Sequence, residues 1–189
     1  IGRGTLITRD NKRVYMFTTN RFYAFPVDAE SDEQVSEVEF DSISSFSLDA
    51  DGNALVVDIV ENVTQLKQVT PGGEVGWVVS FEQGQPSNQP PASSPEGYVY
   101  VVVGSNLHQI RDGEVMWTYP LPASVDDIVI TVLADNSVLA AAGTALAHVS
   151  AAGEEILTKW LDTPIGTRPI MDENGRVYYG GSDGIHCLR

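Results

Sequence analysis

The sequence contains very little cysteine. Cys187 is the single cysteine among 189 residues, so no disulfide can form within the chain and no metal site can be built from several thiolates. Because Cys187 lies in an apolar segment, we expect its thiol to be buried and unreactive. A low cysteine content is found in more than one cellular compartment, so it does not locate the protein.

Basic residues are scarce as well. The chain has 11 Lys and Arg against 26 Asp and Glu, which gives a formal net charge of −15. Since no stretch is rich in Lys or Arg, the surface would repel a phosphate backbone, and nucleic-acid binding is not expected. An acidic surface usually serves solubility, and the alternative is a basic protein partner. The densest acidic stretch is expected to be exposed and contains Asp28, Glu30, Asp32, Glu33, Glu37, Glu39 and Asp41.

Long apolar runs and helical periodicity are also missing. No segment has the length and apolar composition of a transmembrane helix, and no signal-peptide pattern is visible. No window repeats apolar residues at helical spacing, and 17 Gly and 10 Pro interrupt the chain often. We therefore predict an all-β fold with many tight turns.

What the sequence does contain is an internal repeat. Three similar phrases begin 40 residues apart, at Gly73, Gly113 and Gly153, and the first of them is Gly73-Glu74-Val75-Gly76-Trp77. A turn signal recurs upstream of these phrases. The steps between Lys12, taken as its first member, and Gly52, Gly97, Asn136 and Gly175 are 40, 45, 39 and 39 residues. The longer step contains a predicted loop at residues 84–95, which are rich in Pro, Ser, Asn and Gln. A repeat of about 40 residues with strand-like sequence is typical of propeller blades.

A third repeated element is a short strand of the form apolar-x-x-apolar. It occurs at residues 22–25, 66–69, 107–110, 146–149 and 185–188. Each full unit therefore predicts four short antiparallel strands, the composition of a propeller blade. We expect one domain over residues 1–189, with repeats at about 1–41, 42–82, 83–121, 122–161 and 162–189. The last repeat ends before its fourth strand.

These units resemble the PQQ-like (pyrroloquinoline quinone) repeat of β-propellers. The best matches are Tyr98-Val99-Tyr100-Val101, Gly113 with Trp117, and residues 175–184. Propellers of this type usually have seven or eight blades, so the resemblance favours a chain that is part of a larger propeller. The alternative is a closed five-bladed propeller in which the two termini share a blade. WD-type and kelch-type repeats rank lower, because neither of their signatures recurs.

The resemblance does not extend to quinone chemistry. Quinone-dependent dehydrogenases of this repeat class use a cofactor sandwich, a calcium site, an acidic base and commonly a disulfide between adjacent cysteines. The chain has only Cys187 and no recognisable counterpart of the other parts. We therefore expect neither the redox activity nor a bound cofactor.

The histidines and one Asp-rich turn do not predict a metal site. His108 and His186 share one position of the repeated strand, which Tyr23 holds in the first unit, and His148 lies one place later. Rings from different blades should not converge on one ion, so we expect them to serve packing. Residues 49–53 look like the start of a calcium loop, but the same place in other units is a hairpin turn. No motif of a hydrolase, zinc protease or phosphate loop occurs, so no catalytic residue is predicted.

The function expected from the sequence is that of a non-catalytic β-propeller scaffold that uses loops on one face to bind a protein partner, with a basic partner as one option. The residues suggested for binding are Asp28, Glu30, Asp32, Glu33, Gln85 and Asn88. One alternative is a fragment of a quinoprotein dehydrogenase or another propeller enzyme whose active site lies outside this chain. Another is a propeller that binds a small ligand or a carbohydrate. Similar sequences occur in outer-membrane assembly scaffolds and extracytoplasmic sensor domains, so the resemblance implies a periplasmic or extracellular location, and a cytoplasmic one stays open.

Overall fold

The computed structural model describes residues 4–27, 36–82, 84–87, 89–122 and 128–188. In these residues the regular elements are β-strands, which confirms the predicted all-β fold. Nothing in the described part of the chain is a helix long and apolar enough to cross a membrane.

Within the described ranges, nineteen strands form five antiparallel sheets, and each sheet pairs strands that follow one another in the sequence. The first sheet contains β1 (Gly4–Ile7), β2 (Arg13–Phe17), β3 (Arg21–Pro26) and β4 (Ser36–Glu39). The second contains β5 (Ile43–Leu48), β6 (Ala54–Val60), β7 (Val63–Val69) and β8 (Val75–Phe81). The third contains β9 (Ala92–Ser93), β10 (Val99–Val103), β11 (Asn106–Arg111) and β12 (Glu114–Pro120). The fourth contains β13 (Ile128–Val132), β14 (Val138–Ala142), β15 (Ala145–Val149) and β16 (Glu155–Trp160). The fifth contains β17 (Ile170–Met171), β18 (Val177–Gly181) and β19 (Gly184–Leu188), so the predicted four-stranded units and the shorter last unit are confirmed.

The order of the strands gives every sheet two distinct ends. Because neighbouring strands run in opposite directions, the turn between the first and second strands and the turn between the third and fourth strands lie at the same end. We call this end of the five sheets the turn face. The other end, which we call the opposite face, contains the turns between the second and third strands and the connections from one sheet to the next.

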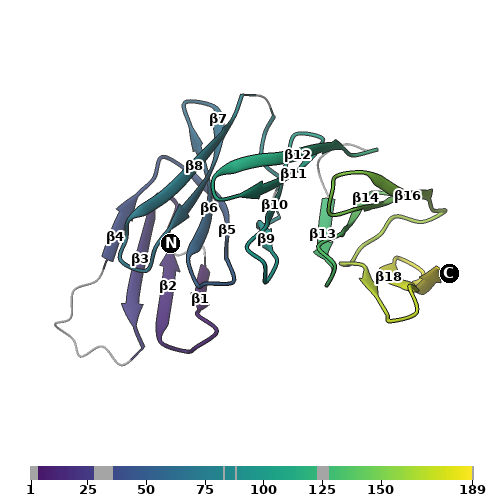
Figure 1. Ribbon diagram of the computed structural model, residues 1–189, viewed down its shortest axis with the longest axis horizontal. Helices are drawn as coiled ribbons and strands as arrows, with labels where there is room; N and C mark the ends of the chain where they lie inside the picture. Colours follow the sequence, from purple (N-terminus) through teal and green to yellow (C-terminus); the bar gives the residue numbers. More distant parts are fainter. Residues whose placement is uncertain (1–3, 28–35, 83, 88, 123–127, 189) are drawn as a thin grey trace.

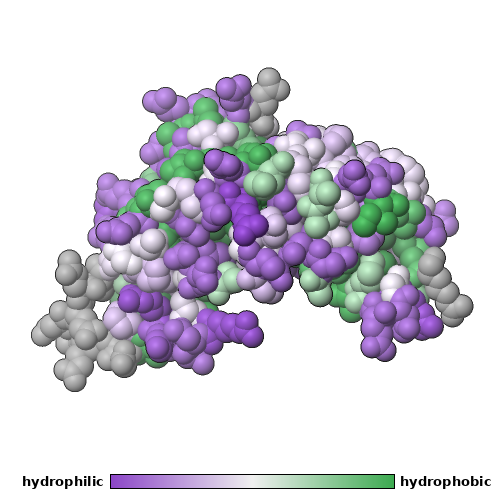
Figure 2. Space-filling model, viewed as in Figure 1, coloured by the Kyte–Doolittle hydropathy of each residue, from purple (hydrophilic) through white to green (hydrophobic). Residues whose placement is uncertain are grey.

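The five sheets follow one another along an arc, with the N-terminal sheet at one end and the C-terminal sheet at the other (Figure 1). The molecule is hollowed on the side between the two ends of the arc (Figure 2). The first strands of neighbouring sheets touch, β5 against β9 and β9 against β13. Apolar side chains fill the space between consecutive sheets; Tyr100 and Leu107 of the third sheet, for example, pack with Ile128 and Val149 of the fourth. This series of stacked antiparallel sheets is the arrangement of propeller blades.

The repeated glycine-to-tryptophan phrase connects neighbouring sheets. A Cβ atom on Gly113 would lie 2.8 Å from Cβ of Trp77 in the preceding sheet, and one on Gly153 would lie 2.6 Å from Cγ of Trp117. Both glycines have positive φ, 80° and 83°. Glycine is needed because of that conformation and because the indole fills the space that a side chain would occupy. The indole N–H of Trp117 also donates a 2.9 Å hydrogen bond to the carbonyl of Ala151. The phrase recurs in the sequence because the second and third sheets each make this contact with the sheet that follows.

Two details correct the sequence prediction. In the first sheet the residue equivalent to Gly52 is Asn11 and not Lys12, because Asn11 has a φ of 57° and its N–H bonds to the carbonyl of Thr8, as that of Gly52 bonds to Asp49. The first turn is one residue longer than the others, which shifts the repeat by one position. Cys187 is exposed and not buried. Among the described residues the fifth sheet has no fourth strand to cover it.

Candidate functional site

An exposed acidic residue recurs along the turn face. In every sheet the turn between the first and second strands contains a residue with positive φ: Asn11, Gly52, Gly97, Asn136 and Gly175. In four sheets the residue directly before it is acidic, and in the fifth an acid lies two residues before it: Asp10, Asp51, Glu96, Asp135 and Glu173. All five acids are exposed. One carboxylate per sheet therefore follows the arc, and we call these five residues the first acidic row.

A second acidic row lies at the turns between the third and fourth strands. Glu74, Glu114 and Glu154 each directly follow a turn glycine, and all three are exposed. Side-chain hydroxyls fix the backbone at two of these turns. The hydroxyls of Thr70 and Ser150 accept hydrogen bonds from the N–H groups of Glu74 and Glu154, at 3.2 and 3.1 Å. The two rows lie at the same end of the sheets because both kinds of turn do.

Turn chemistry explains only some of these carboxylates. Asp10 accepts hydrogen bonds from the Thr8 hydroxyl (2.6 Å) and the Lys12 N–H (3.0 Å). Asp135 accepts them from the hydroxyl (2.6 Å) and N–H (3.0 Å) of Ser137. The hydrogen bonds from the hydroxyls of Thr8 and Ser137 are the main reason that the pKa of each carboxyl lies below its usual range, and the bonds from the backbone N–H groups lower it further. Glutamate has a longer side chain and does not close such turns, so the glutamates of the two rows are not required by the backbone.

The turns of the three middle sheets carry almost no compensating positive charge. Their acidic residues are Asp49, Asp51, Glu74, Glu96, Asp112, Glu114, Asp135 and Glu154, and the one basic residue is Arg111. The guanidinium of Arg111 is already engaged: it lies 4.9 Å from the centre of the Tyr98 ring, donates to the Tyr98 hydroxyl at 3.0 Å and lies 3.7 Å from the Asp112 carboxylate. The turn face of these sheets is therefore strongly anionic at neutral pH.

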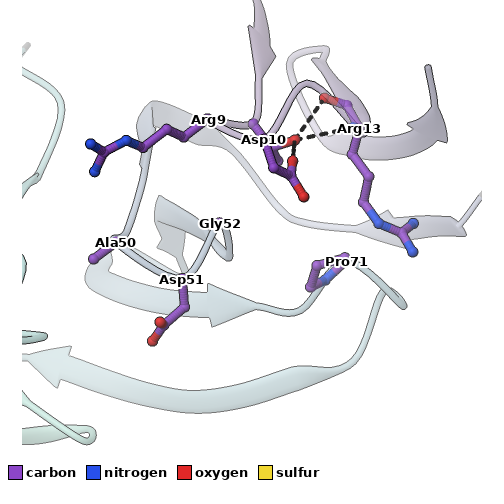
Figure 3. A pocket seen from close by; sticks show the side chains of 8 residues that line it. Arg9, Asp10, Arg13, Ala50, Asp51, Gly52 and Pro71 are labelled. Carbon is purple, nitrogen blue, oxygen red and sulfur yellow. Dashed lines mark hydrogen bonds between the residues drawn. The ribbon is translucent and has the colours of Figure 1, made fainter.

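The turn face changes character at the first sheet. A hollow of about 350 Å³ lies between the β1–β2 turn, the β5–β6 turn and Pro71, and Arg9, Asp10, Arg13 and Asp51 supply its charged groups. Arg9 and Arg13 extend in opposite directions on two sides of Asp10 (Figure 3). Neither arginine has an ion pair with a carboxylate in the described ranges. Two cations and two anions line the hollow, so the strongly anionic turn face of the middle sheets does not continue onto the first sheet.

Most of the residues suggested for binding from the sequence cannot be placed, because Asp28, Glu30, Asp32, Glu33 and Asn88 lie outside the described residues. Gln85 is exposed, and its carbonyl accepts a 2.8 Å hydrogen bond from the N–H of Gly104 at the opposite face. It therefore does not belong with the acidic rows. Glu37 and Glu39 are exposed as expected, but both pair with Arg21 of the neighbouring strand, at 2.6 and 2.9 Å.

The sequence prediction missed the two rows, although a signal for them is present. An acid directly precedes the turn anchors Gly52, Gly97 and Asn136, and the repeated phrases at Gly73, Gly113 and Gly153 all continue with glutamate. These acids are spread over the chain and do not form a dense run. Only the stacking of the sheets shows that they follow one edge.

The histidines lie in separate sheets, and two of them pack on aromatic rings as expected. The ring of His108 lies 4.7 Å from that of Phe81, its Nδ1 is 2.9 Å from the Thr118 hydroxyl, and burial lowers its pKa to about 4. His186 stacks on Tyr179 at 5.0 Å, and its Nε2 lies 2.7 Å from a carboxylate oxygen of Asp183. Within the described ranges, no three His, Cys, Asp or Glu side chains converge as metal ligands would.

One group of residues resembles a nucleophilic triad in composition only. Ser137 Oγ lies 2.6 Å from the Asp135 carboxylate and 2.9 Å from Nε2 of His148. The carboxylate can only accept, so the serine donates its proton to Asp135, and His148 donates to the serine oxygen. A catalytic triad needs the reverse, a histidine that accepts the proton of the serine. Ser137 is also only 2% exposed. The three side chains therefore fix the turn between β13 and β14, and burial lowers the pKa of His148.

Comparison with known proteins shows the fold. No family model and no curated protein sequence matches the chain. Among solved structures, virginiamycin B lyase from Staphylococcus aureus superposes with a TM-score of 0.64 at 14% identity, over 100% of this chain and 69% of the lyase chain. A gluconolactonase from Xanthomonas campestris gives a TM-score of 0.57 at 14% identity, over 99% of this chain and 71% of that one. A protein of unknown function from Bacteroides caccae gives 0.62 at 14% identity, over 95% and 70%. The chain thus has the fold of a β-propeller and corresponds to part of larger propeller chains.

Proposed function

We propose that this protein is a non-catalytic β-propeller module that binds a basic segment of a partner protein along its turn face. The observation that supports this function is the recurrence of an exposed carboxylate at the same turn position of successive sheets. Glutamate occupies several of these positions although the geometry of the turns does not require it. If the surface were acidic only to keep the protein in solution, its charges would not need to lie at the same turn position of successive sheets.

The spacing of the rows suits an extended partner. Each sheet adds one member of the first row, and the middle sheets add one of the second, so a basic segment that follows the arc meets carboxylates at every sheet. A single exposed ion pair contributes only about 0.2–1 kcal/mol. Affinity therefore comes from the number of pairs, and it falls as added salt screens them. The mixed charges around the hollow at Arg9 and Arg13 would mark one end of this surface.

The experiment compares two variants with the same change in net charge. The first replaces four turn-face glutamates by glutamine, at Glu74, Glu96, Glu114 and Glu154. The second neutralises four exposed acids of the opposite face, with Asp41→Asn, Glu61→Gln, Glu82→Gln and Asp162→Asn. Binding of a fluorescent lysine-rich peptide is measured by anisotropy at low and at physiological salt. Urea unfolding of both variants verifies that they are folded.

We expect the turn-face variant to lose about tenfold or more in affinity, which corresponds to four pairs of modest strength. The opposite-face variant should stay within about twofold of the original protein. Equal losses in both variants would mean that only the net charge matters, and a lack of binding by the original protein would remove the proposal.

The type of repeat is also a proposal. The Gly-x-x-x-Trp phrases and the strand Tyr98-Val99-Tyr100-Val101 support the PQQ-like type. The structural similarities do not discriminate between propeller types. Similarity to a lyase and a gluconolactonase does not favour an enzymatic function, since at 14% identity it concerns the fold alone.

A further inference from the structure

The fourth strands of the first four sheets differ in how their outer edges are protected. Each of them is the last strand of its sheet, so its outer edge has no partner strand among the described residues. Such an edge exposes unpaired backbone groups, and proteins protect it with short strands, charged side chains or proline. Three of the four strands have residues of this kind: Glu37 and Glu39 in β4, Glu114 and Pro120 in β12, and Glu155 and Lys159 in β16.

β8 in the second sheet has none of these features. It is seven residues long, from Val75 to Phe81, and contains neither a charged residue nor proline. In an antiparallel pair, alternate residues bond to the neighbouring strand, so the other residues of β8 direct their N–H and C=O groups away from β7. A long edge without charge readily pairs with another extended chain.

One face of β8 is buried, whereas apolar side chains are exposed beside its outer edge. Val79 and Phe81 pack against the third sheet. Val75 and Val78 are 47% and 44% exposed. Figure 2 shows hydrophobic surface over the second sheet. β8 therefore offers both free backbone groups and apolar contact area to a further strand.

The position of Val78 is polar in the next two sheets. It lies five places after the turn glycine, where the third sheet has Thr118 and the fourth has Thr158. The hydroxyl of Thr118 lies 2.9 Å from Nδ1 of His108, and that of Thr158 lies 3.4 Å from the hydroxyl of Tyr119. The second sheet thus exposes an apolar side chain where its neighbours have a hydroxyl with a partner.

The charges at the two ends of β8 indicate what would bind there. Glu74 directly precedes the strand, Glu82 directly follows it, and both are exposed. Neither has an ion pair within the described ranges. A segment with apolar residues in its middle and a basic residue at each end would match this edge. A second copy of β8 would instead bring its own two glutamates to these ends, where like charges repel.

We propose that the outer edge of β8 binds an extended segment of a partner protein as an added strand, and that this segment has β-branched or aromatic residues in its middle and Lys or Arg at both ends. Backbone hydrogen bonds with β8 hold the segment. Its apolar side chains contact Val75 and Val78, and its basic residues pair with Glu74 and Glu82. The site is a strand edge and not the turn face, so this inference does not depend on the proposed function.

The probe is the synthetic peptide Lys-Val-Thr-Val-Thr-Val-Thr-Val-Lys, acetylated, amidated and labelled with a fluorophore. Its nine residues match the nine positions from Glu74 to Glu82. A control peptide carries an N-methyl group on every middle residue, so it keeps the charges but cannot donate backbone hydrogen bonds. In the protein, Val78→Lys adds a charge to the edge of β8, and Met116→Lys adds the same charge to β12 at a side chain that is 53% exposed. Urea unfolding verifies that both variants are folded.

Binding is measured by anisotropy, and amide hydrogen exchange locates the peptide on the unaltered protein. The peptide should slow the exchange of alternate residues of β8, because their N–H groups then donate to it. N-methylation and Val78→Lys should each weaken binding about tenfold or more, whereas Met116→Lys should stay within about twofold. Glu74→Gln together with Glu82→Gln should weaken binding about twofold to fivefold.

Four results would overturn the proposal. Equal losses in Val78→Lys and Met116→Lys would mean that the peptide responds only to net charge. Equal binding of the N-methylated peptide would exclude strand pairing, and so would exchange that slows outside β8 but not within it. A dimer that protects the same amides without peptide would show that a second copy occupies the edge.

Discussion

The contact between a turn glycine and the tryptophan of the preceding sheet gives the sharpest prediction of stability. Gly153 has a φ of 83°, and a Cβ atom there would lie 2.6 Å from Cγ and 2.8 Å from Cδ2 of Trp117. Alanine in this left-handed conformation costs about 1–2 kcal/mol. Overpacking against the indole adds about 1–3 kcal/mol, because the hydrogen bond of the indole N–H to Ala151 opposes its withdrawal. We expect Gly153→Ala to lower the free energy of unfolding by about 2–5 kcal/mol.

A matched control separates the two causes. Gly97 has nearly the same φ, 85°, but no atom lies within 4 Å of the Cβ that alanine would add. Gly97→Ala should therefore cost only the conformational part, about 1–2 kcal/mol. Urea unfolding followed by circular dichroism measures both variants.

A double-mutant cycle tests the origin of the difference. Trp117→Leu removes the indole, and leucine is acceptable at this position because Leu157 occupies it in the fourth sheet. In that background the cost of Gly153→Ala should fall to that of Gly97→Ala. If Gly153→Ala costs no more than about 0.5 kcal/mol beyond Gly97→Ala in the original protein, the proposed contact does not hold the sheets together.

Three further predictions follow from single side chains. Asp58 is fully buried and bonds to Lys67 at 2.7 Å, so Lys67→Met should destabilise the protein by about 3–5 kcal/mol in urea unfolding. Adding Asp58→Val, the residue that the third sheet has at the equivalent Val103, should recover part of this loss, because valine removes the unpaired charge but also the 2.8 Å acceptor of the Ser42 N–H. A double variant no better than the single one would contradict the assignment. Burial lowers the pKa of His108 to about 4 from an unfolded value of 6.5, so the unfolded chain binds this proton first and stability falls as the pH drops from about 6.5 to 4. Because the ring is partly exposed, we expect this drop in pH to lower the free energy of unfolding by about 1–2 kcal/mol. In His108→Gln, the urea midpoint should no longer fall over this pH range for this reason; the same pH dependence in the variant as in the original protein would refute the role of His108. Cys187 is exposed, so native protein should react with a maleimide nearly as fast as protein unfolded in urea, and strong protection in the native state would contradict its placement.

The fold could be predicted because its signals repeat. Apolar pairs return in all five units and turn glycines in four of them, so single departures, such as Leu157 in place of tryptophan, do not obscure the pattern. The register of the first turn could not be predicted, since one extra residue moves the positive φ from the position of Lys12 to Asn11. The exposure of Cys187 could not be predicted either, because the apolar pattern shows that a strand has a core face but not whether anything covers it.

Contacts between sheets could not be predicted from the sequence, for a different reason. Trp77 and Gly113 are 36 residues apart and belong to different units, and no local sequence pattern indicates that the glycine lies over the indole. The acidic rows present the same difficulty, because their members are neighbours only along the arc. The acidic stretch at residues 28–41 is conspicuous in the sequence, yet two of its described members, Glu37 and Glu39, are paired with Arg21.

In the proposed function, the turn face binds a basic protein segment. The most direct test is to titrate the isotope-labelled protein with a lysine-rich peptide and to map the amide chemical-shift changes by NMR. We expect the largest changes at the two acidic rows, around Asp51, Glu96 and Asp135 and around Glu114 and Glu154, and we expect them to shrink as salt is added. Changes centred on the opposite face, around Glu61 and Glu82, or changes spread evenly over both faces, would contradict it.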